Sequence, residues 1–221
     1  VVDNDPQSNS TEILKALGTS FRCSLYELLD PGTKGNLDPG TKGNPALIES
    51  CIYPTIHKNL YLLPNVEETS GLEMEFVGRY PDSRLFLRNV LRDYAGNNFD
   101  VTLIDNGPNL GIMVANSLYA SDWVIVPIDV RSSFSVDGIR KVLDMITAVR
   151  TSGNDDLKFL RMLINLVDRR TSMSNIIMDD IKNRFGEDQM FRTTIPINVP
   201  FQQAEFAKET VFKWAATSRG A

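Results

Sequence analysis

Two apolar segments that end in aspartates constrain the fold more than any other feature of the sequence. Residues 1–6 read VVDNDP, and a much later segment, residues 99–108, reads FDVTLIDNGP. Each has the apolar character of a buried strand and reaches an aspartate, Asp3 or Asp105, just before a turn. Ligands of open α/β sheets lie outside the carboxyl ends of parallel strands, where carboxylates from two strands can converge on one divalent cation. The pattern therefore predicts a parallel sheet with a Mg²⁺ site at one edge.

Apolar runs alternate with helical patterns along the whole chain, which is typical of an α/β fold with a mostly parallel sheet flanked by helices. The predicted strands are 1–3, 60–64, 99–105, 123–127, 159–165 and 191–195. The predicted helices are 10–17, 82–94, 110–119, 135–150, 172–185 and 202–208. At 221 residues the chain suits a single domain, 1–221.

The composition favours a globular protein, with 42% hydrophobic and 23% charged residues. No segment approaches the ~20 consecutive apolar residues of a membrane span, so no transmembrane segment is predicted. The net charge of −5 gives no overall attraction to nucleic acid. Binding to DNA would therefore need a local basic patch.

Cys23 and Cys51 show neither the spacing of metal ligands nor a disulfide framework. They are predicted to be buried apolar side chains of a protein from a reducing cytoplasm. His57, the one histidine, lies in the Pro-containing stretch 53–58 and is predicted to be a solvated loop residue.

Residues 29–44 form a tandem octapeptide, LDPGTKGN repeated twice. Two Asp-Pro-Gly turns with one leucine per copy cannot cover a core, so a surface loop is predicted. The stretch 35–42 superficially resembles the phosphate-binding pattern G-x-x-x-x-G-K-[ST], but Thr41 and Lys42 are exchanged and no buried strand precedes it. Phosphate binding is not expected there.

Five blocks of sequence carry a resemblance to a known family. Residues 2–9 resemble the V-D-x-D-P-Q-G-N signature of the ParA/MinD family of deviant Walker ATPases, and residues 99–111 are similar to its F/Y-D-x-h-h-I-D-x-P-P-S-L-G, where h is apolar. Residues 123–127, followed by Gly138, resemble its strand V-I-I-P-V and the next helix. Residues 168–171 resemble its D-x-R-T loop and residues 195–199 its I-P-R-N-V. The resemblance implies a P-loop NTPase fold of the SIMIBI type.

The chain departs from the family pattern in two ways. The family's first motif, K-G-G-x-G-K-T, lies upstream of V-D-x-D-P-Q, whereas this sequence begins at Val1 within a predicted strand. The resemblance thus predicts an N-terminally truncated chain without the first strand and P-loop, with weak or no activity by itself. In addition, residues 106–109 read NGPN where the family usually has x-P-P-S, and Ile197 and Pro200 replace arginines of some members.

The resemblance implies roles for three aspartates. Asp105 resembles the Walker B aspartate, which holds Mg²⁺ through a water ligand. Asp5 matches the catalytic position that orients the attacking water, and Asp3 matches the aspartate beside the metal shell. Without the family, Asp105 could be a strand-end residue that caps the next helix, and Asp5 is better read as an Asp-Pro turn residue.

The resemblance also implies contacts to the nucleotide. Gly107 and Pro108 would form the loop that senses the γ-phosphate of ATP. Asn165 and Asp168, at and after a predicted strand end, match the purine-contacting loop, and Asn198 lies in the I-P-x-N-V block. An ordinary strand-to-helix turn and loop capping remain the alternatives for these residues.

The family's non-specific DNA binding uses basic residues of the C-terminal third. The candidates here are Lys182, Arg184, Arg192, Lys208 and Lys213. Acidic residues, including Asp180 and Glu187, are interleaved with them, so a solvated charged face is the alternative interpretation.

The resemblance implies a ParA/Soj-type ATPase that binds ATP and Mg²⁺, forms a homodimer and drives plasmid or chromosome partition. Its partner would be a ParB-like centromere-binding protein, and its location the bacterial cytoplasm in association with the nucleoid. Two alternatives stay open: a catalytically inert ParA-like interaction module, and a MinD-like positioning ATPase, although residues 209–221 are short and carry little basic face.

Overall fold

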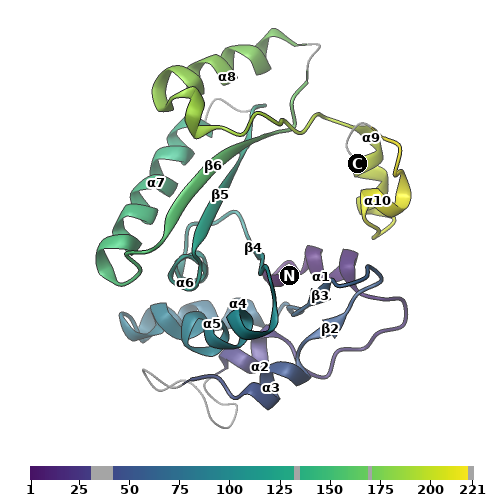
Figure 1. Cartoon of the computed structure of the whole chain (residues 1–221), viewed down its shortest axis with the longest axis vertical. Helices are drawn as coiled ribbons and strands as arrows, with labels where there is room; N and C mark the ends of the chain where they lie inside the picture. The colour runs from purple at the N-terminus through teal and green to yellow at the C-terminus, as the bar shows by residue number, and fades with distance from the viewer. Residues whose placement is uncertain (31–41, 132–134, 169–170, 219–221) are drawn as a thin grey trace. The chain divides into compact units, whose positions relative to one another are not determined.

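The computed structural model describes residues 1–30, 42–131, 135–168 and 171–218. Contacts within the chain divide it into two compact units, Val1–Ser121 and Asp122–Ala221, which are described separately (Figure 1). The single-domain assignment stays a prediction. Most of the octapeptide loop 29–44 lies outside the described residues, as do Arg169 and Arg170 of the D-x-R-T block.

The first unit is built on a short parallel pair of strands. β1 (Val2–Asn4) pairs with β4 (Ile104–Asn106), and the register sets Asp3 opposite Asp105. On the other side of β1, the backbone N–H of Asp3 donates to Leu63 O at 3.1 Å. Leu63 directly follows β3 (Tyr61–Leu62), which pairs antiparallel with β2 (Tyr53–Pro54). β1 is therefore bonded to chain segments on both sides.

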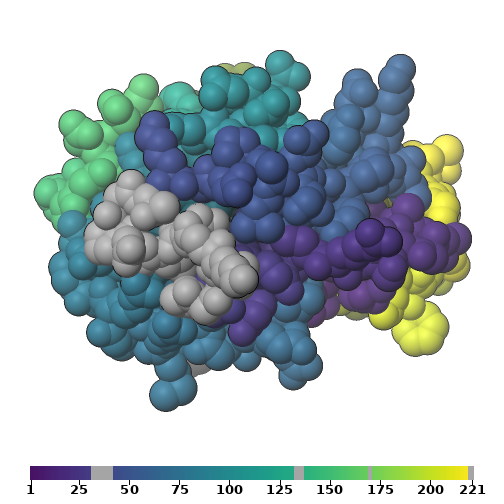
Figure 2. Space-filling view, turned by 90° about the horizontal axis from the view of Figure 1, so that it is seen from below, coloured from purple at the N-terminus to yellow at the C-terminus, as the bar shows by residue number. Residues whose placement is uncertain are grey.

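Helices pack around this pair and supply most of the core. They are α1 (Asn9–Leu14), α2 (Leu25–Leu29), α3 (Pro45–Ser50), α4 (Thr69–Gly78), the 3₁₀ helix η1 (Asp82–Leu85), α5 (Phe86–Asn98) and α6 (Ile112–Ala120). The rings of Phe76 and Phe86 meet edge to face with centroids 5.1 Å apart at the buried centre. In Figure 2 the purple N-terminal segment lies at the surface beside the blue segment that follows β3.

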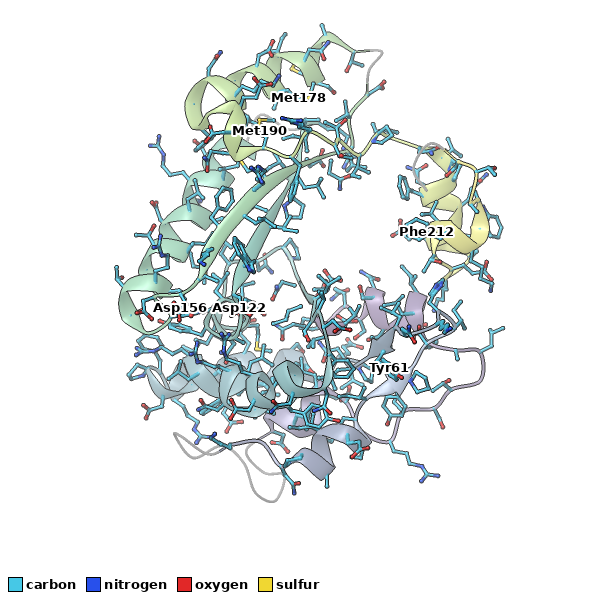
Figure 3. All side chains as sticks on the ribbon, in the orientation of Figure 1. Tyr61, Asp122, Asp156, Met178, Met190 and Phe212 are labelled. Atoms are coloured by element: carbon cyan, nitrogen blue, oxygen red, sulfur yellow. A yellow bond between two sulfur atoms is a disulfide. The ribbon has the colours of Figure 1, made fainter. Side chains whose placement is uncertain are left out.

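A second aromatic contact in this unit joins β3 to the segment that precedes β4. Tyr61, labelled in Figure 3, lies with its ring centroid 5.7 Å from that of Phe99. Phe99 ends α5 and starts the segment that leads into β4. This contact helps to hold the approach to β4 beside β3.

The second unit is a βαβ arrangement. β5 (Trp123–Asp129) pairs in parallel with β6 (Lys158–Asn165), and α7 (Ser135–Ser152) connects them. Further along the chain lie α8 (Ser172–Phe185), the 3₁₀ helix η2 (Glu187–Gln189), α9 (Val199–Phe206) and α10 (Val211–Trp214). Met190 and Pro196 add single parallel bridges to Met162 and Val167. In the part of the chain that is described, no helix is long and apolar enough to cross a bilayer.

The α/β class with parallel strands and flanking helices is confirmed, and the solved structures described below share this fold. Helix 172–185 lies where it was predicted. The strand predicted over 99–105 is shorter, because Val2 faces Ile104 and earlier residues have no ladder partner in β1. The strand predicted over 191–195 is wrong: this stretch contains no strand, only isolated bridges at its two flanks.

The cysteines require a correction. They are buried as predicted, with Cys23 7% and Cys51 0% exposed, but they form a disulfide with Cα atoms 4.6 Å apart. Cys23 precedes α2 and Cys51 ends α3, and both helices pack on the same core. This proximity arises from tertiary packing, which the spacing of two cysteines does not reveal.

Candidate functional site

The carboxyl ends of β1 and β4 bring the predicted aspartates to one edge of the sheet. Asp3 and Asp105 are register partners, and Asp5 and Gly107 follow them in the adjoining loops. A Cβ atom placed on Gly107 would lie 3.1 Å from Asp5 Oδ1. The two loops thus lie side by side, and the edge holds three carboxylates from segments far apart in sequence.

Asp3 is completely buried and organises the residues around it. Its Oδ2 accepts hydrogen bonds from the backbone N–H of Thr11 at 2.8 Å and from Thr11 Oγ1 at 2.7 Å, and its Oδ1 accepts one from Asp5 N at 3.1 Å. Burial raises the pKa of the Asp3 carboxyl; these hydrogen bonds oppose the rise, and the nearby Asp105 charge adds to it. Asp3 therefore holds the Asp5 loop and α1 in place.

Asp5 forms the first turn of the loop after β1. Its Oδ1 accepts from Gln7 N at 3.0 Å and its backbone carbonyl accepts from Ser8 N at 2.8 Å. Its Oδ2 accepts no hydrogen bond from the described residues. This geometry fixes the carboxylate while leaving one oxygen available to a ligand or a water molecule.

Asp105 is exposed, and a hydroxyl group orients it. Ser10 Oγ, from α1, donates to Asp105 Oδ2 at 2.5 Å. Sequence reasoning missed Ser10 and Thr11, whose hydroxyls bond the two register partners Asp105 and Asp3. Two successive hydroxyl residues in the helix that follows an Asp-Pro-Gln turn are the signal that could have found them.

The donor set at this edge suits a hard divalent cation. Asp105, Asp5 and Ser10 offer only oxygen atoms, and Mg²⁺ in proteins takes one or two carboxylates and keeps several waters. Among the described residues, no three acidic, histidine or cysteine side chains form a metal cluster. A cation here would be held by Asp105 and by water that Ser10 and Asp5 could bond.

A hollow of about 460 Å³ borders the Asp5 loop. It is lined by Thr11, Glu12 and the segments 6–8 and 65–68. Thr11 connects this hollow to the edge of the sheet, since its Oγ1 donates to Asp3 and accepts from Asn65 N at 2.9 Å.

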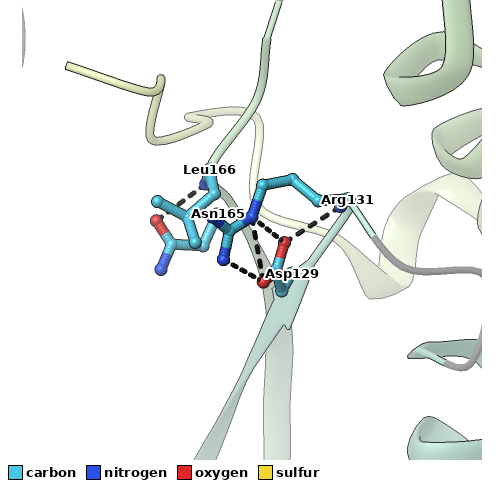
Figure 4. A network of polar contacts seen from close by, with 4 residues as sticks. All are labelled: Asp129, Arg131, Asn165 and Leu166. Atoms are coloured by element: carbon cyan, nitrogen blue, oxygen red, sulfur yellow. Dashed lines mark hydrogen bonds and ion pairs between the residues drawn. The ribbon is translucent and has the colours of Figure 1, made fainter.

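The predicted purine contacts all lie in the second unit. Asn165 ends β6 opposite Asp129, and Figure 4 shows its Oδ1 accepting the backbone N–H of Leu166 at 2.9 Å. Asp168 begins the turn before α8, where its carbonyl accepts from Thr171 N at 3.2 Å. Asn198 precedes α9, and its Nδ2 is buried without a partner among the described residues.

Beside Asn165 stands an ion pair. Arg131 Nη2 donates to Asp129 Oδ2 at 2.6 Å and Arg131 Nε to Oδ1 at 2.9 Å (Figure 4). The hydrogen bond from Arg131 holds the pKa of the Asp129 carboxyl below its usual value, although partial burial opposes this. The pair fixes the polypeptide directly after β5.

The five candidate DNA contacts are largely engaged with acidic neighbours. Lys182 Nζ lies 3.4 Å from Glu187 Oε1, and Arg184 Nε donates to Asp180 Oδ1 at 2.8 Å. Lys213 pairs with Glu209. Lys208, which follows α9, and Arg192, which lines a hollow of about 850 Å³ beside η2, both have exposed side chains. Their binding to DNA stays a prediction.

Comparison with known proteins adds a family relationship. Residues 1–159 match the family described as AAA domain. The chain is 27% identical over 221 residues to the sporulation initiation inhibitor protein Soj of Bacillus subtilis, covering 100% of this chain and 81% of that protein. It is 29% identical over 221 residues to the chromosome-partitioning ATPase Soj of Thermus thermophilus, covering 100% of this chain and 78% of that protein.

Solved structures show the same fold. A crystal structure of cobyrinic acid a,c-diamide synthase from Mycobacterium smegmatis with bound ADP and magnesium matches with a TM-score of 0.72 and 28% identity, over 94% of this chain and 76% of that one. The cell division ATPase MinD of Pyrococcus furiosus matches with a TM-score of 0.71 over 100% of this chain and 79% of that one. At 18% identity the second match concerns the fold alone.

Proposed function

The chain belongs to the ParA/MinD family of ATPases, and from this premise we propose that it is the ATP-hydrolysing domain of a protein that partitions a plasmid or chromosome. The observation that supports the proposal most directly is the meeting of Asp5 with the loop after Asp105 at one sheet edge. A nucleotide whose terminal phosphate lies at this edge would face carboxylates from both strands.

The residues would share the work as follows. Asp105 would hold Mg²⁺ through water, with Ser10 fixing the carboxylate. Asp5, whose Oδ2 stays open, would orient the attacking water, and Asp3 would keep Asp5 in position. When bound, Mg²⁺ neutralises charge that develops on the phosphate oxygens. The protein's share in phosphoryl transfer is mainly such positioning.

Binding of the phosphates needs further donors. No part of residues 1–221 contains K-G-G-x-G-K-T. If about three or four phosphate contacts of ~1.5–3 kcal/mol each are absent, affinity for ATP falls at least about a thousandfold. We therefore expect residues 1–221 alone to hydrolyse ATP weakly or not at all.

The biological setting follows from the same premise. The protein would form a homodimer around ATP in the bacterial cytoplasm, associate with the nucleoid and be reset by a ParB-like partner. A MinD-like membrane role receives less support, because α10, with the exposed Phe212 (Figure 3), is only 4 residues long.

The test is phosphate release from ATP by the complete protein, with and without Mg²⁺. Asp5→Ala should lower kcat about 100-fold while ATP still binds. Asp100→Ala, which removes an exposed carboxylate from the segment leading to β4, is the matched control and should leave kcat unchanged. ATP binding with no hydrolysis by the wild type would favour the inert module and reject the proposed function.

A further inference from the structure

A buried polar network lies on the face of the β1–β4 pair opposite to Asp3 and Asp105. Side chains alternate along a strand, so Asn4 and Asn106, which are register partners, point to the other face. Asn4 is 1% exposed, and its Nδ2 lies 3.0 Å from Asn106 Oδ1. The family signatures that this chain resembles leave both positions open, as V-D-x-D and I-D-x-P.

The network continues into α6. Asn4 Nδ2 lies 3.0 Å from the carbonyl oxygen of Met113 and 2.9 Å from Ser117 Oγ. Ser117 Oγ in turn donates to Asn106 Oδ1 at 2.6 Å, and Ser117 is 2% exposed. One side chain of β1 is thereby tied to the end of β4 and to the first turns of α6.

These contacts enclose the loop 107–111. Asn106 is the last residue before this loop, and Met113 belongs to the first turn of the helix after it. Asn4 therefore bonds to both ends of the segment that contains Gly107. Asp5, the first residue after β1, lies so near Gly107 that an added Cβ there would come within 3.1 Å of Asp5 Oδ1.

Asn4 keeps this position at a cost. Its Oδ1 is buried and has no hydrogen-bond partner among the described residues. An apolar residue of similar size would avoid that unsatisfied acceptor, so the Asn4 amide lowers the free energy of unfolding relative to such a residue. A buried polar group that is kept in this way needs an explanation beyond packing.

We propose that Asn4, together with Asn106 and Ser117, is a positioning clamp that sets the loop 107–111 against Asp5 and thereby the rate of the chemical step. The proposal rests on the proposed ATPase function, because it assigns the loop to the terminal phosphate. Asn4 touches no reacting atom and acts through Gly107 and Asp5. Loss of the clamp loosens the loop without removing any group that binds the nucleotide.

Asn116 provides a matched control. It is also a fully buried asparagine of α6, but its Oδ1 accepts from Leu87 N at 3.1 Å and its Nδ2 donates to Ile112 O at 3.0 Å. It contacts α5 and its own helix and does not bond β1 or β4. Asn116→Ala thus measures the effect of losing a buried amide next to Ser117 without breaking the clamp.

The first measurement is steady-state kinetics of the complete protein. Asn4→Ala should lower kcat about 10–100-fold, since small displacements of positioned groups cost rates of this order, and should leave KM within about twofold. Asn116→Ala should keep kcat per folded molecule near the wild-type value. If Asn4→Ala does not fold, Ser117→Ala, which leaves Asn4 in place and removes the hydroxyl, should give the same selective loss of kcat.

The second measurement is hydrogen–deuterium exchange of the peptide that covers residues 107–111, which needs no hydrolysis. Exchange should accelerate about tenfold in Asn4→Ala or Ser117→Ala and not in Asn116→Ala. Equal exchange in the clamp and control variants, or a loss expressed in KM rather than kcat, would overturn the clamp. Absence of hydrolysis by the wild type would overturn the proposed function instead, and exchange would still decide whether the clamp exists.

Discussion

Ser10 Oγ donates a 2.5 Å hydrogen bond to Asp105 Oδ2, although 95 residues separate them in sequence. Groups that hydrogen-bond a metal-binding carboxylate orient it, and their loss typically weakens metal affinity or activity about 10–100-fold. We therefore predict that Ser10→Ala raises the Mg²⁺ concentration for half-maximal ATPase activity of the complete protein about tenfold. Ser70→Ala, at an exposed position of α4, is the control. An unchanged Mg²⁺ dependence would show that Ser10 does not orient a metal ligand.

Gly107 leaves room for the Asp5 carboxylate, because an added Cβ would approach Asp5 Oδ1 to 3.1 Å. Gly107→Ala should displace Asp5 and lower kcat about tenfold or more. Gly96→Ala is the matched control, since Gly96 lies in the last turn of α5 and a Cβ added there meets nothing within 4 Å. Gly96→Ala should raise the free energy of unfolding by up to about 0.5–1 kcal/mol and leave kcat unchanged. Equal kcat in both variants would contradict the prediction.

The ion pair of Asp129 and Arg131 should make stability depend on pH. The hydrogen bond from Arg131 lowers the folded-state pKa of Asp129 below the ordinary value of an aspartate. The stability that the ion pair contributes is fully present above the pKa of Asp129 in the unfolded chain. It is lost as the pH falls through the lower pKa of Asp129 in the folded protein. Urea denaturation should thus find Arg131→Gln less stable than the wild type at neutral pH, with a small difference because the pair is exposed.

This difference should shrink as the pH falls below the ordinary pKa of an aspartate and through the lower folded-state pKa of Asp129. Arg192→Gln removes an exposed positive charge from the same unit and should not reproduce the pattern. A difference between wild type and Arg131→Gln that stays constant with pH would exclude the stated cause.

The disulfide between Cys23 and Cys51 closes a loop with a sequence separation of 28. A crosslink of this length stabilises a fold by about 3.5 kcal/mol, mainly by restricting the unfolded chain. Reduction should therefore lower the melting temperature of the wild type. The double variant Cys23→Ser/Cys51→Ser should have a lower melting temperature from the start, and reductant should not change it. Alkylation of the native protein, read by mass spectrometry, should modify neither cysteine. Two modified thiols in the native protein would refute the crosslink.

Local patterns in the sequence predicted the strand ends well. The aspartate-before-turn signal at Asp3 and Asp105 needs only neighbours in sequence, and helix 172–185 carries its own start signal and periodicity. α4 escaped prediction because its sequence, TSGLEMEFVG, includes Gly71 and Gly78. Each glycine lowers helix preference by about 1 kcal/mol, and packing of Leu72 and Phe76 outweighs this deficit.

The groups that support the site could not be predicted, because each depends on contacts distant in sequence. Ser10 is a functional candidate only once α1 lies against β4, and Asn4 and Asn106 form a pair only in the observed strand register. The same holds for the cysteines, whose pairing needs α2 and α3 on a common core. Sequence patterns identified which strands end in carboxylates, and tertiary structure determines what holds those carboxylates.

The alignment of β1 with β4 has a consequence for misfolding. Shifting β1 by a single residue would set Asn4 against Asp105 and turn every side chain of the strand to the wrong side. The Asp3 carboxylate would then point to the side of the pair that faces α6 and would lose its Thr11 donors. A misaligned chain would bury a carboxylate without its hydrogen-bond donors. Correct folding and assembly of the site therefore depend on the same three pairs of residues.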